Sequence, residues 1–479
     1  MPTLILTENF EKFTSDIIIG IEVHIQLNTA TKLFCSCASK REDAPNTRTC
    51  QTCLGHPGSK PLVNKKAIEF AAMLALALHC KINPEIRFSR KVYFYPDLAK
   101  NYQITQFEVP LGENGCIILD SGKKIKIERI HLEEDPASLI HPAGIEKSQY
   151  TLIDYNRSGI PLCEIVTAPE MHSPEEAREF MNKLKIILQY LKIFDENFCV
   201  IKADANISIK ESGYIRSEIK NITGFKEIED ALAYEIQRQK QAIQNNEKLI
   251  QDTRGWNPDN KTTIRLRTKE TEADYGYIID PDLVPIQLSE KFIKQIQQLM
   301  PELPEQKIHK FIHTHKIAET DAKVLAAEYR LAELFEQIAV EVSPQIAAKW
   351  LRRELTRVVN YNKMNLSQLK IDSKHLIELF SMIEKNEITE TVGQDIMNQL
   401  ILKPFSPKEY VQKNNLAKIQ DKTQLESICK EIISKNAKVV QDYKNGKQEA
   451  LHFLIGQVMK QMKGKADAKL LKELFEKMI

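Results

Sequence analysis

The sequence predicts an α+β protein with a large mixed-sheet cradle domain, an all-α helical domain and a small all-α tail domain. Strand-like runs mix with a few helices up to about Pro285. From Ser289 onward, strand patterns fade and apolar residues recur at helical spacing. The proline-bounded stretch 404–407 then separates a last helical segment. We therefore expect domains at residues 1–290, 291–405 and 406–479.

The first region contains clear strand and helix patterns. Residues 17–25 are rich in β-branched side chains and alternate in polarity from Ile21 onward, and residues 205–209 alternate likewise. A helix is expected to begin at Ser173, because Ser173, Pro174 and Glu176 form a capping box with proline at the first helical position. This helix is expected to continue to about Leu191. Mixed strands and helices of this kind indicate an α+β body with a large sheet.

The region after residue 289 has the periodicity of helices, which Pro301, Pro304 and Pro344 divide into short segments. Residues 436–479 hold nine lysines against five acidic residues, a net charge of +4 in a small unit. The lysines of this unit can contact nucleic-acid phosphates, or they can form a helix face that is only exposed to solvent. The apolar positions that set the periodicity are Val324, Leu325, Leu331, Leu334, Phe335 and Ile338.

The composition is that of an ordinary globular protein. The chain has 479 residues, of which 42% are hydrophobic and 28% charged, and these values exclude a largely disordered chain. A net charge of +2 gives no overall field that would mark a nucleic-acid partner. We find no signal peptide, and no apolar run reaches the roughly 18 residues of a membrane span. We expect a cytoplasmic protein that does not enter a membrane.

Four of the nine cysteines lie close together in the sequence. Cys35 and Cys37 form a C-x-C pair, and Cys50 and Cys53 form a C-x-x-C pair. Two such pairs supply the thiolates of a structural Zn²⁺ site, with zinc–sulfur distances of about 2.3 Å. The alternatives are four small buried hydrophobic side chains or a redox pair. A closed four-thiolate site leaves no open coordination position, so we expect its role to be structural.

Carboxylates and imidazoles recur at three places in the predicted strands. Glu22 and His24 are two residues apart and therefore point to the same face of one strand. A second cluster occupies residues 131–135, and Glu164 interrupts the apolar run 161–166. Oxygen ligands with one imidazole suit a Mg²⁺ or Mn²⁺ ion that bridges nucleotide phosphates. Taken singly, each residue is better explained as an exposed carboxylate or an ion pair, and spacing does not show that the segments converge.

Basic and aromatic residues alternate between Arg90 and Lys100. Tyr93, Tyr95 and Lys100 are candidate nucleotide-binding residues, because tyrosines stack on bases and lysines bind phosphates. The same aromatics can equally form a core corner around a proline turn. The sequence contains no phosphate loop, dinucleotide fingerprint or kinase catalytic loop, and no serine or cysteine nucleophile motif.

In this order, the segments resemble the B subunits of the aspartyl/glutamyl-tRNA(Asn/Gln) amidotransferases, over essentially the whole chain. Two of the most specific motifs are Leu132-Glu133-Glu134-Asp135 and the run from Asp154 to Val166. The matching segments are residues 19–27, 32–35, 88–97, 100–106, 132–135, 154–166, 204–208, 218–222, 268–270, 274–277, 281–283 and 446–467.

The resemblance implies one subunit of an ATP-dependent, glutamine-hydrolysing amidotransferase, a carbon–nitrogen ligase that acts as a heterotrimer. The A subunit, an amidase, hydrolyses glutamine, and the small C subunit holds the assembly together. The subunit that this chain resembles binds tRNA(Gln) or tRNA(Asn) carrying Glu or Asp, and it activates the side-chain carboxylate with ATP and Mg²⁺. Ammonia then arrives through an internal channel. The missing nucleophile motif agrees with this division of labour.

The resemblance also implies site residues. Lys91 matches a lysine near the channel mouth, so we expect Lys91 and Glu134 to be catalytic; Glu133 is the neighbour with which Glu134 is easily confused. Cys35, Cys37, Cys50 and Cys53 match zinc ligands that some members carry. The Mg²⁺ ligands carried over by motif are Glu22, His24, Glu134 and Glu164.

The chain departs from the family pattern at several positions. Val92 stands where an asparagine is usual, and Gly276 replaces an arginine in an Asp-Tyr-Arg-Tyr segment. The second change removes a planar, permanently charged group that can hold phosphate. It places in doubt any site assigned around residues 274–277, but not the resemblance itself.

Two other functions remain open. The main alternative is a non-catalytic tRNA-binding scaffold protein that retains the same fold, for which the metal ligands need not be kept together. The second is a stand-alone ATP-dependent ligase that acts on a free acid, against which the basic tail counts. The sequence leaves open whether Glu-tRNA(Gln), Asp-tRNA(Asn) or both are substrates.

Overall fold

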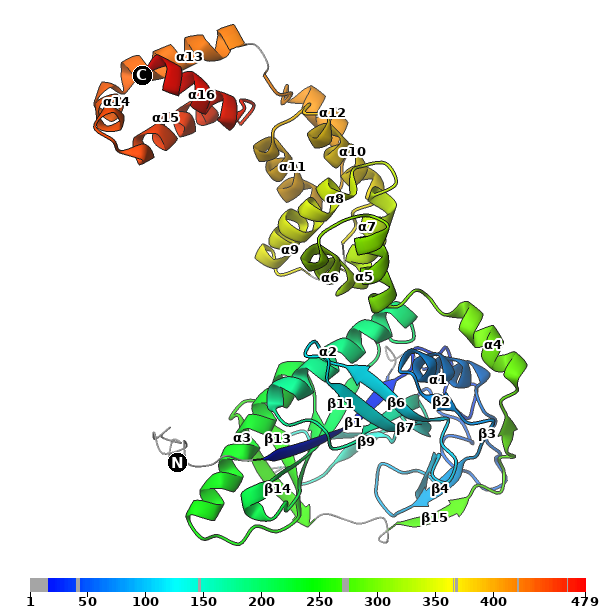
Figure 1. Cartoon of the computed structure of the whole chain (residues 1–479). Coiled ribbons are helices and arrows are strands. Elements are labelled where there is room, and N and C mark those ends of the chain that lie inside the picture. Colours follow the sequence, from blue (N-terminus) through cyan, green and yellow to red (C-terminus); the bar gives the residue numbers. More distant parts are fainter. Residues whose placement is uncertain are drawn as a thin grey trace. The chain divides into compact units, whose positions relative to one another are not determined.

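In the computed structural model, the described residues are 16–39, 44–144, 148–268, 275–364, 366, 369–419, 422–462 and 464–479. The chain divides into two units, Met1–Leu303 and Pro304–Ile479. The first unit contains a large mixed sheet with helices, and the described part of the second is helical (Figure 1). The predicted α+β class is therefore confirmed. The finer division near residues 290 and 405 stays a prediction.

The first unit is built on a nine-stranded sheet with the order β14-β13-β12-β11-β1-β10-β7-β6-β2. Neighbouring strands are antiparallel except for β12 and β13, which are parallel. A short 3-10 turn, η2 (Lys210–Ser212), follows β11. The strands are β1 (Ile17–Gln26), β2 (Lys81–Ile82), β6 (Gly112–Ile118), β7 (Lys124–Glu134), β10 (Pro161–Thr167), β11 (Ile201–Ile209), β12 (Ser217–Ile222), β13 (Asp252–Asn257) and β14 (Thr262–Thr268).

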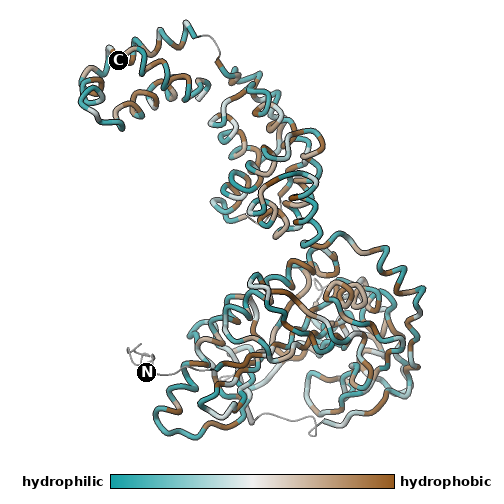
Figure 2. The backbone as a smooth tube through the Cα atoms, in the orientation of Figure 1, coloured by the Kyte–Doolittle hydropathy of each residue, from teal (hydrophilic) through white to brown (hydrophobic). Residues whose placement is uncertain are grey.

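The two faces of this sheet differ in polarity, because side chains alternate along each strand. In β1, Ile21, Val23 and Ile25 are buried in the hydrophobic core, whereas Glu22 and His24 point to the opposite face. Figure 2 shows the hydrophobic residues along the central strands. The sheet therefore has one face for packing and one that is free to carry charged groups.

Three long helices supply most of the helical side chains of the core, to which α4 (Glu290–Leu299) adds Ile296. The second of them begins at the predicted cap, where the Ser173 hydroxyl accepts from the Glu176 N–H at 3.2 Å and Pro174 follows. The Glu176 carboxylate accepts instead from the His172 N–H at 2.8 Å, so the reciprocal half of the capping box is shifted by one residue. The helices are α1 (Lys65–Ala77), α2 (Pro174–Leu191) and α3 (Phe225–Gln244).

Among the described residues of the first unit, three small sheets and the helix α4 remain. A three-stranded sheet has the order β15-β4-β5, and two further sheets pair β16 with β3 and β8 with β9. The helix α4 (Glu290–Leu299) packs against α1. The strands are β3 (Glu85–Ile86), β4 (Ser89–Val92), β5 (Tyr102–Thr105), β8 (Ser138–Ile140), β9 (Leu152–Asp154), β15 (Gly276–Ile279) and β16 (Ile286–Gln287).

The second unit is a succession of short helices. Pro304 and Pro344 begin two of them, as expected. The helices are α5 (Pro304–His313), α6 (Glu319–Ala326), α7 (Tyr329–Ile338), α8 (Pro344–Trp350), the π-helical turn η4 (Leu351–Leu355), α9 (Thr356–Tyr361), α10 (Ser373–Glu384), α11 (Glu390–Leu402), α12 (Pro407–Lys413), α13 (Lys422–Lys435), α14 (Ala437–Lys444), α15 (Gln448–Gln461) and α16 (Ala468–Met478).

The predicted helical periodicity of this unit is correct except at one position. Leu325, Leu331, Phe335 and the other apolar residues of the pattern are buried, but Val324 is 39% exposed. The buried stripe of α6 consists of Ala322, Leu325 and Ala326. Val324 lies about 100° around the helix from Leu325 and therefore falls outside that stripe.

The helices α13 to α16 share a hydrophobic cluster that includes Leu425, Leu451, Leu454 and Phe475. Within the described ranges, no helix combines the length and the hydrophobicity that crossing a bilayer requires.

We expect Leu132→Ala to destabilise the first unit by about 2–5 kcal/mol, because Leu132 is fully buried and its removal leaves a cavity. Leu152→Ala, at a side chain that is 52% exposed, is the matched control and should change stability by less than about 0.5 kcal/mol. Urea unfolding followed by Trp256 fluorescence, in a Trp350→Phe background, measures both changes. Equal effects of the two substitutions would contradict the placement of Leu132 in the core.

Candidate functional site

The polar face of the central sheet gathers charged side chains from strands that are distant in sequence. Opposite residues in an antiparallel pair share a face. His24 is opposite Glu164, Glu164 is opposite His131, and Glu22 is opposite Asp204. The spacing in the sequence could not show that these three segments converge. The register of the paired strands brings their charged side chains together.

Three of these side chains form a first candidate metal-binding group. One ligand atom each of His24, Glu133 and Glu164 lies within 4.8 Å of the others. His24 Nε2 is 3.4 Å from Glu164 Oε2 and 3.7 Å from Glu133 Oε1. His131 Nε2 is 3.3 Å from the same oxygen of Glu164. One imidazole with two carboxylates is a donor set that fits Mg²⁺ or Mn²⁺.

A second acidic group lies further along the same face. Glu22, Asp204 and Glu218 also offer ligand atoms within 4.8 Å of one another. Lys220 Nζ lies 2.9 Å from Asp204 Oδ2 and 3.1 Å from Glu218 Oε1. The Asn206 amide donates to Glu22 Oε1 at 3.1 Å. The two groups meet at β1, where Glu22 and His24 are two residues apart.

Burial and mutual repulsion perturb these groups strongly. Burial and the charge of Glu164 raise the pKa of Glu133. Burial, Glu164 and Asp204 likewise raise the pKa of Glu22. Burial alone would lower the pKa of His24, but the hydrogen bond and charge of Glu164, together with Glu133, raise it to about 10. Carboxylates that hold protons or attract a cation in this way are typical of metal and catalytic sites.

Glu134 lies apart from the first group. Its Oε1 accepts from Lys100 Nζ at 2.5 Å and from the Ile104 N–H at 2.8 Å. Successive residues of β7 point to opposite faces, so only one of the two adjacent glutamates can join His24 and Glu164. The geometry favours Glu133 for that position, and the motif-based role of Glu134 as a ligand stays a prediction.

The other sequence-predicted residues lie near this end of the site. Lys91 Nζ is 4.5 Å from the ring centre of Tyr275 and 6.0 Å from that of Tyr93. The charge of Lys91 acts on Glu133 and opposes the rise in its pKa. Tyr93 is half-buried and Tyr95 is 50% exposed. Residues 269–274, which include part of the motif ending at Tyr277, lie outside the described ranges.

The four clustered cysteines come together as expected. Cys35, Cys37, Cys50 and Cys53 each place the sulfur within 4.8 Å of the others. The Cys50 and Cys53 sulfurs are 3.9 Å apart, close to the separation of about 3.8 Å that a tetrahedral site with 2.3 Å zinc–sulfur bonds requires. All four are free of disulfides. This arrangement is compatible with a zinc ion.

The thiols of this group also influence one another. Hydrogen bonding from Cys35 is the largest cause that lowers the pKa of Cys53 to about 4. Burial opposes this change, and the Cys50 N–H and the Lys32 ammonium assist it. Burial and a hydrogen bond with Cys50 raise the pKa of Cys37 to about 11. Deprotonation of all four sulfurs therefore needs a strong compensating charge, which a divalent cation supplies.

A loop after the cysteines supports Lys100. Gly55 has a backbone φ of +68°, and a Cβ added there would meet Lys100 Cγ at 2.3 Å. Only glycine adopts this conformation without strain and leaves room for the lysine stem. The cysteine segment thereby contacts the Lys100–Glu134 pair.

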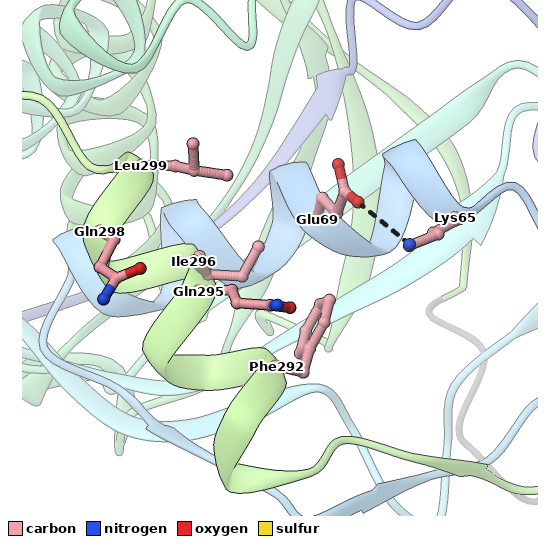
Figure 3. A pocket seen from close by; sticks show the side chains of 7 residues that line it. All are labelled: Lys65, Glu69, Phe292, Gln295, Ile296, Gln298 and Leu299. Carbon is pink, nitrogen blue, oxygen red and sulfur yellow. Dashed lines mark ion pairs between the residues drawn. The ribbon is translucent and has the colours of Figure 1, made fainter.

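One of two described cavities lies beside the acidic groups. It has a volume of ≈ 760 Å³, and Glu22, Asn206, Tyr214 and Arg216 are among its lining residues. The other cavity lies between α1 and α4 and contains none of the site residues (Figure 3). Its lining residues are Lys65, Glu69, Phe292, Gln295, Ile296, Gln298 and Leu299.

Sequence reasoning did not assign Asp204, Glu218 and Lys220 to the site. It placed His131 and Glu133 in the cluster 131–135, but gave the ligand role to Glu134. The sequence did contain a signal that could have found them: charged residues at every second position within strands that are rich in β-branched side chains. Asp204 and Glu218 stood in segments recognised for their resemblance, but nothing in their spacing linked them to Glu22.

Carboxylate groups along one face of a mixed sheet, with a cavity beside them, make this chain an α+β protein with a candidate metal-binding site. The model of the GatB/GatE catalytic domain matches residues 17–294, and that of the GatB domain matches residues 333–479. The chain belongs to the family of aspartyl/glutamyl-tRNA(Asn/Gln) amidotransferase B subunits, which confirms the resemblance read from its motifs.

Relatives that carry this name match almost the whole chain. The protein from Thermodesulfovibrio yellowstonii is 41% identical over 472 residues, which cover 96% of this chain and 98% of the relative. The Thermotoga maritima protein is 39% identical over 474 residues, with the same coverage. The Methanospirillum hungatei protein is 42% identical over 478 residues, covering 96% and 99%.

We expect the purified chain to carry about one zinc ion, and Cys50→Ala to weaken zinc binding by roughly 10-fold or more, since it removes one of four ligands. Cys116→Ala is the matched control, because Cys116 is also half-buried but lies outside the group. Metal analysis and competition with a chelator measure the binding. Equal zinc affinity of the two variants would exclude the cysteine site.

In the metal-free chain, we expect His24 to make the free energy of unfolding fall as pH rises from about 6.5 to about 10. The pKa of His24 is about 10 in the folded chain against an ordinary value of 6.5. Its stabilising charge is thus fully present below the lower value and lost as pH passes through the higher one. The loss should exceed about 1 kcal/mol, since one pKa unit corresponds to about 1.4 kcal/mol.

Urea unfolding of the wild type and of His24→Gln, at about pH 6.5 and about pH 9.5, tests this pH dependence. The difference between the two proteins isolates His24 from the cysteines, which titrate in both. A stability difference that does not change with pH would contradict the expectation.

Proposed function

We propose that this chain activates the side-chain carboxylate of Glu-tRNA(Gln) or Asp-tRNA(Asn) with ATP, so that ammonia can convert it to the amide. The observation that carries the proposal is the pair of acidic groups that meet at Glu22 and His24 on one sheet face. Membership of the amidotransferase B-subunit family supports the substrate class. The tRNA, the nucleotide and the partner subunits are parts of this proposal.

The residues proposed to hold Mg²⁺ are His24, Glu133 and Glu164 in the first group, with Glu22 joining them to the second. Glu133 takes the place that motif matching gave to Glu134, because its carboxylate faces His24. Glu134 instead fixes Lys100 at the edge of the site. A bound Mg²⁺ ion would neutralise negative charge on the phosphates of the nucleotide.

The cavity beside Glu22 is the proposed position of the nucleotide. Arg216 and Tyr214 offer a guanidinium for phosphate and a ring for stacking, and Asn206 offers an amide. Glu22, Asp204 and Glu218 would hold a second cation, which would neutralise phosphate charge. Tyr93, Tyr95 and Lys100, which the sequence suggested for the nucleotide, lie outside the lining of this cavity and stay candidates on the side of Glu134.

A carboxylate is a poor acyl donor, because oxide is a poor leaving group. Attack of a carboxylate oxygen on the γ-phosphorus of ATP would release ADP and give an acyl phosphate. Ammonia would then attack the carbonyl carbon, and phosphate would leave. Lys91, whose charge acts on Glu133, would hold the substrate carboxylate or its phosphate.

The proposed partners follow from what this chain lacks in sequence. It offers no nucleophile motif for the release of ammonia from glutamine, so a glutaminase, the A subunit, would supply ammonia and a small C subunit would complete a heterotrimer. The lysines of residues 436–479, among them Lys460 and Lys465, are proposed to bind tRNA phosphates. Lys463, which belongs to the same group, lies outside the described ranges.

We expect Glu133→Gln to lower ATP-dependent amidation by about 100-fold and to raise the Mg²⁺ concentration needed, because a metal ligand is lost. Glu134→Gln should lower the rate without changing the Mg²⁺ requirement, and Glu175→Gln, at an exposed position on α2, is the control. The reaction is reconstituted with both partner subunits, ATP, glutamine and each mischarged tRNA. Glutaminase activity of the partner should remain measurable in all variants.

Two outcomes of this experiment would change the assignment. A Mg²⁺ requirement that shifts in Glu134→Gln but not in Glu133→Gln would return the ligand role to Glu134. A wild-type assembly that binds tRNA but amidates neither mischarged tRNA would overturn the proposal in favour of a scaffold function.

A further inference from the structure

A lysine lies completely buried against the cysteine group. The relative exposure of Lys32 is 0%. Its Nζ donates to the Cys53 sulfur at 3.7 Å and to the Tyr155 carbonyl oxygen at 3.2 Å. A buried ammonium is costly unless an anion or several hydrogen bonds compensate it. The surroundings of Lys32 must therefore supply negative charge.

The described residues around Lys32 contain no carboxylate paired with it. Gly159, which has a backbone φ of +85°, lies against the lysine stem: a Cβ added there would be 3.5 Å from Lys32 Cδ and 3.7 Å from Cys53 Cβ. The anion available to the ammonium is therefore a cysteine thiolate. Four thiolates around one Zn²⁺ ion carry a net charge of −2, which one neighbouring ammonium reduces to −1.

We propose that Lys32 is a positioning residue of the cysteine metal site, where it acts as a fixed counter-charge and hydrogen-bond donor to the Cys53 sulfur. This inference goes beyond the proposed amidation, because it concerns only the metal site. An N–H···S bond lowers the energy of the sulfur lone pair and makes the metal-bound sulfur less reactive. Lys32 thereby retains the metal, and it also ties Cys53 to the backbone of Tyr155.

The same contact joins the cysteine group to the loop 155–159. The Lys32 N–H donates to the Cys37 carbonyl at 2.9 Å, and the Leu33 N–H donates to the Gly159 carbonyl at 2.8 Å. The Ser158 hydroxyl reaches the Cys53 carbonyl at 3.5 Å. The backbone of Lys32 and Leu33 is thus fixed by hydrogen bonds to Cys37 and Gly159. The ammonium of Lys32 is therefore positioned without a metal ion.

The experiment compares Lys32→Met with Lys60→Met in the full chain. Lys60 is exposed and follows the cysteine segment, so its substitution removes one positive charge near the site without touching a sulfur. Transfer of zinc to a chromogenic chelator should be about 10-fold faster from Lys32→Met, as is usual when a partner of a metal ligand is removed. In the cobalt-substituted chain, the sulfur-to-cobalt charge-transfer band of Lys32→Met should move to lower energy.

The cobalt band separates a direct contact with sulfur from a general loss of stability. Faster zinc release with an unmoved band would mean that Lys32 only fills space, and this result would overturn the proposal, as would release and spectra equal to those of Lys60→Met. If Lys32→Met does not fold, Lys32→Gln, which removes the charge with a smaller change of shape, is measured in the same way. A wild-type chain without a tetrathiolate cobalt spectrum would exclude the metal site itself.

Discussion

Strand β1 lies in the middle of the large sheet, between β10 and β11, and its register decides which side chains meet. Val23 and Ile25 pack into the core, while Glu22 and His24 face the other way, opposite Asp204 and Glu164. A slip of one residue would turn every side chain of the strand over. The charged residues would then enter the core and the site would disappear, so the hydrophobic packing of one face also fixes the chemistry of the other.

The polar face brings like charges together at an electrostatic cost. Glu22, Glu133, Glu164, Asp204 and Glu218 crowd a small area, and burial removes much of the water that would screen them. Lys220 and the two imidazoles offset only part of this charge. Divalent cations would relieve repulsion of this kind, and the proposed function requires such cations at this face together with the phosphates of a nucleotide.

Much of the fold followed from local rules in the sequence. The predicted helix starts at Ser173, Pro304 and Pro344 were correct, because capping residues and prolines act on the backbone over only a few residues. The cysteine group was also predictable, since both pairs are local and the intervening segment is short. The prediction that Val324 is buried was wrong, because the periodicity in the sequence did not separate the buried stripe of α6 from the position next to it.

The site was less predictable, because it depends on pairing between distant strands. Glu133 and Glu134 have nearly the same sequence context and differ only in the face to which they point. Asp204 and Glu218 meet across a register shift between β11 and β12, which no local pattern reveals. Val92 and Gly276, two departures from the family pattern, are opposite each other on β4 and β15. The two departures therefore lie at the same place in the structure, and neither Val92 nor Gly276 carries a charge there.

Four sulfurs around one metal ion would leave no open coordination position, yet the cysteine group lies against the side chains that frame the polar face. From one side of it, Gly55 makes room for the stem of Lys100, which holds Glu134. From the other side, Lys32 connects Cys53 to Tyr155, whose hydroxyl donates to the Pro96 carbonyl next to Tyr95. A closed metal centre resists deformation better than a loop of the same length, because it cross-links four points of the chain. With a metal bound, this cross-link would help to fix the position of Lys100 and of the loop 155–159. Loss of the metal would then reach the carboxylates through these contacts without any change in their own strands.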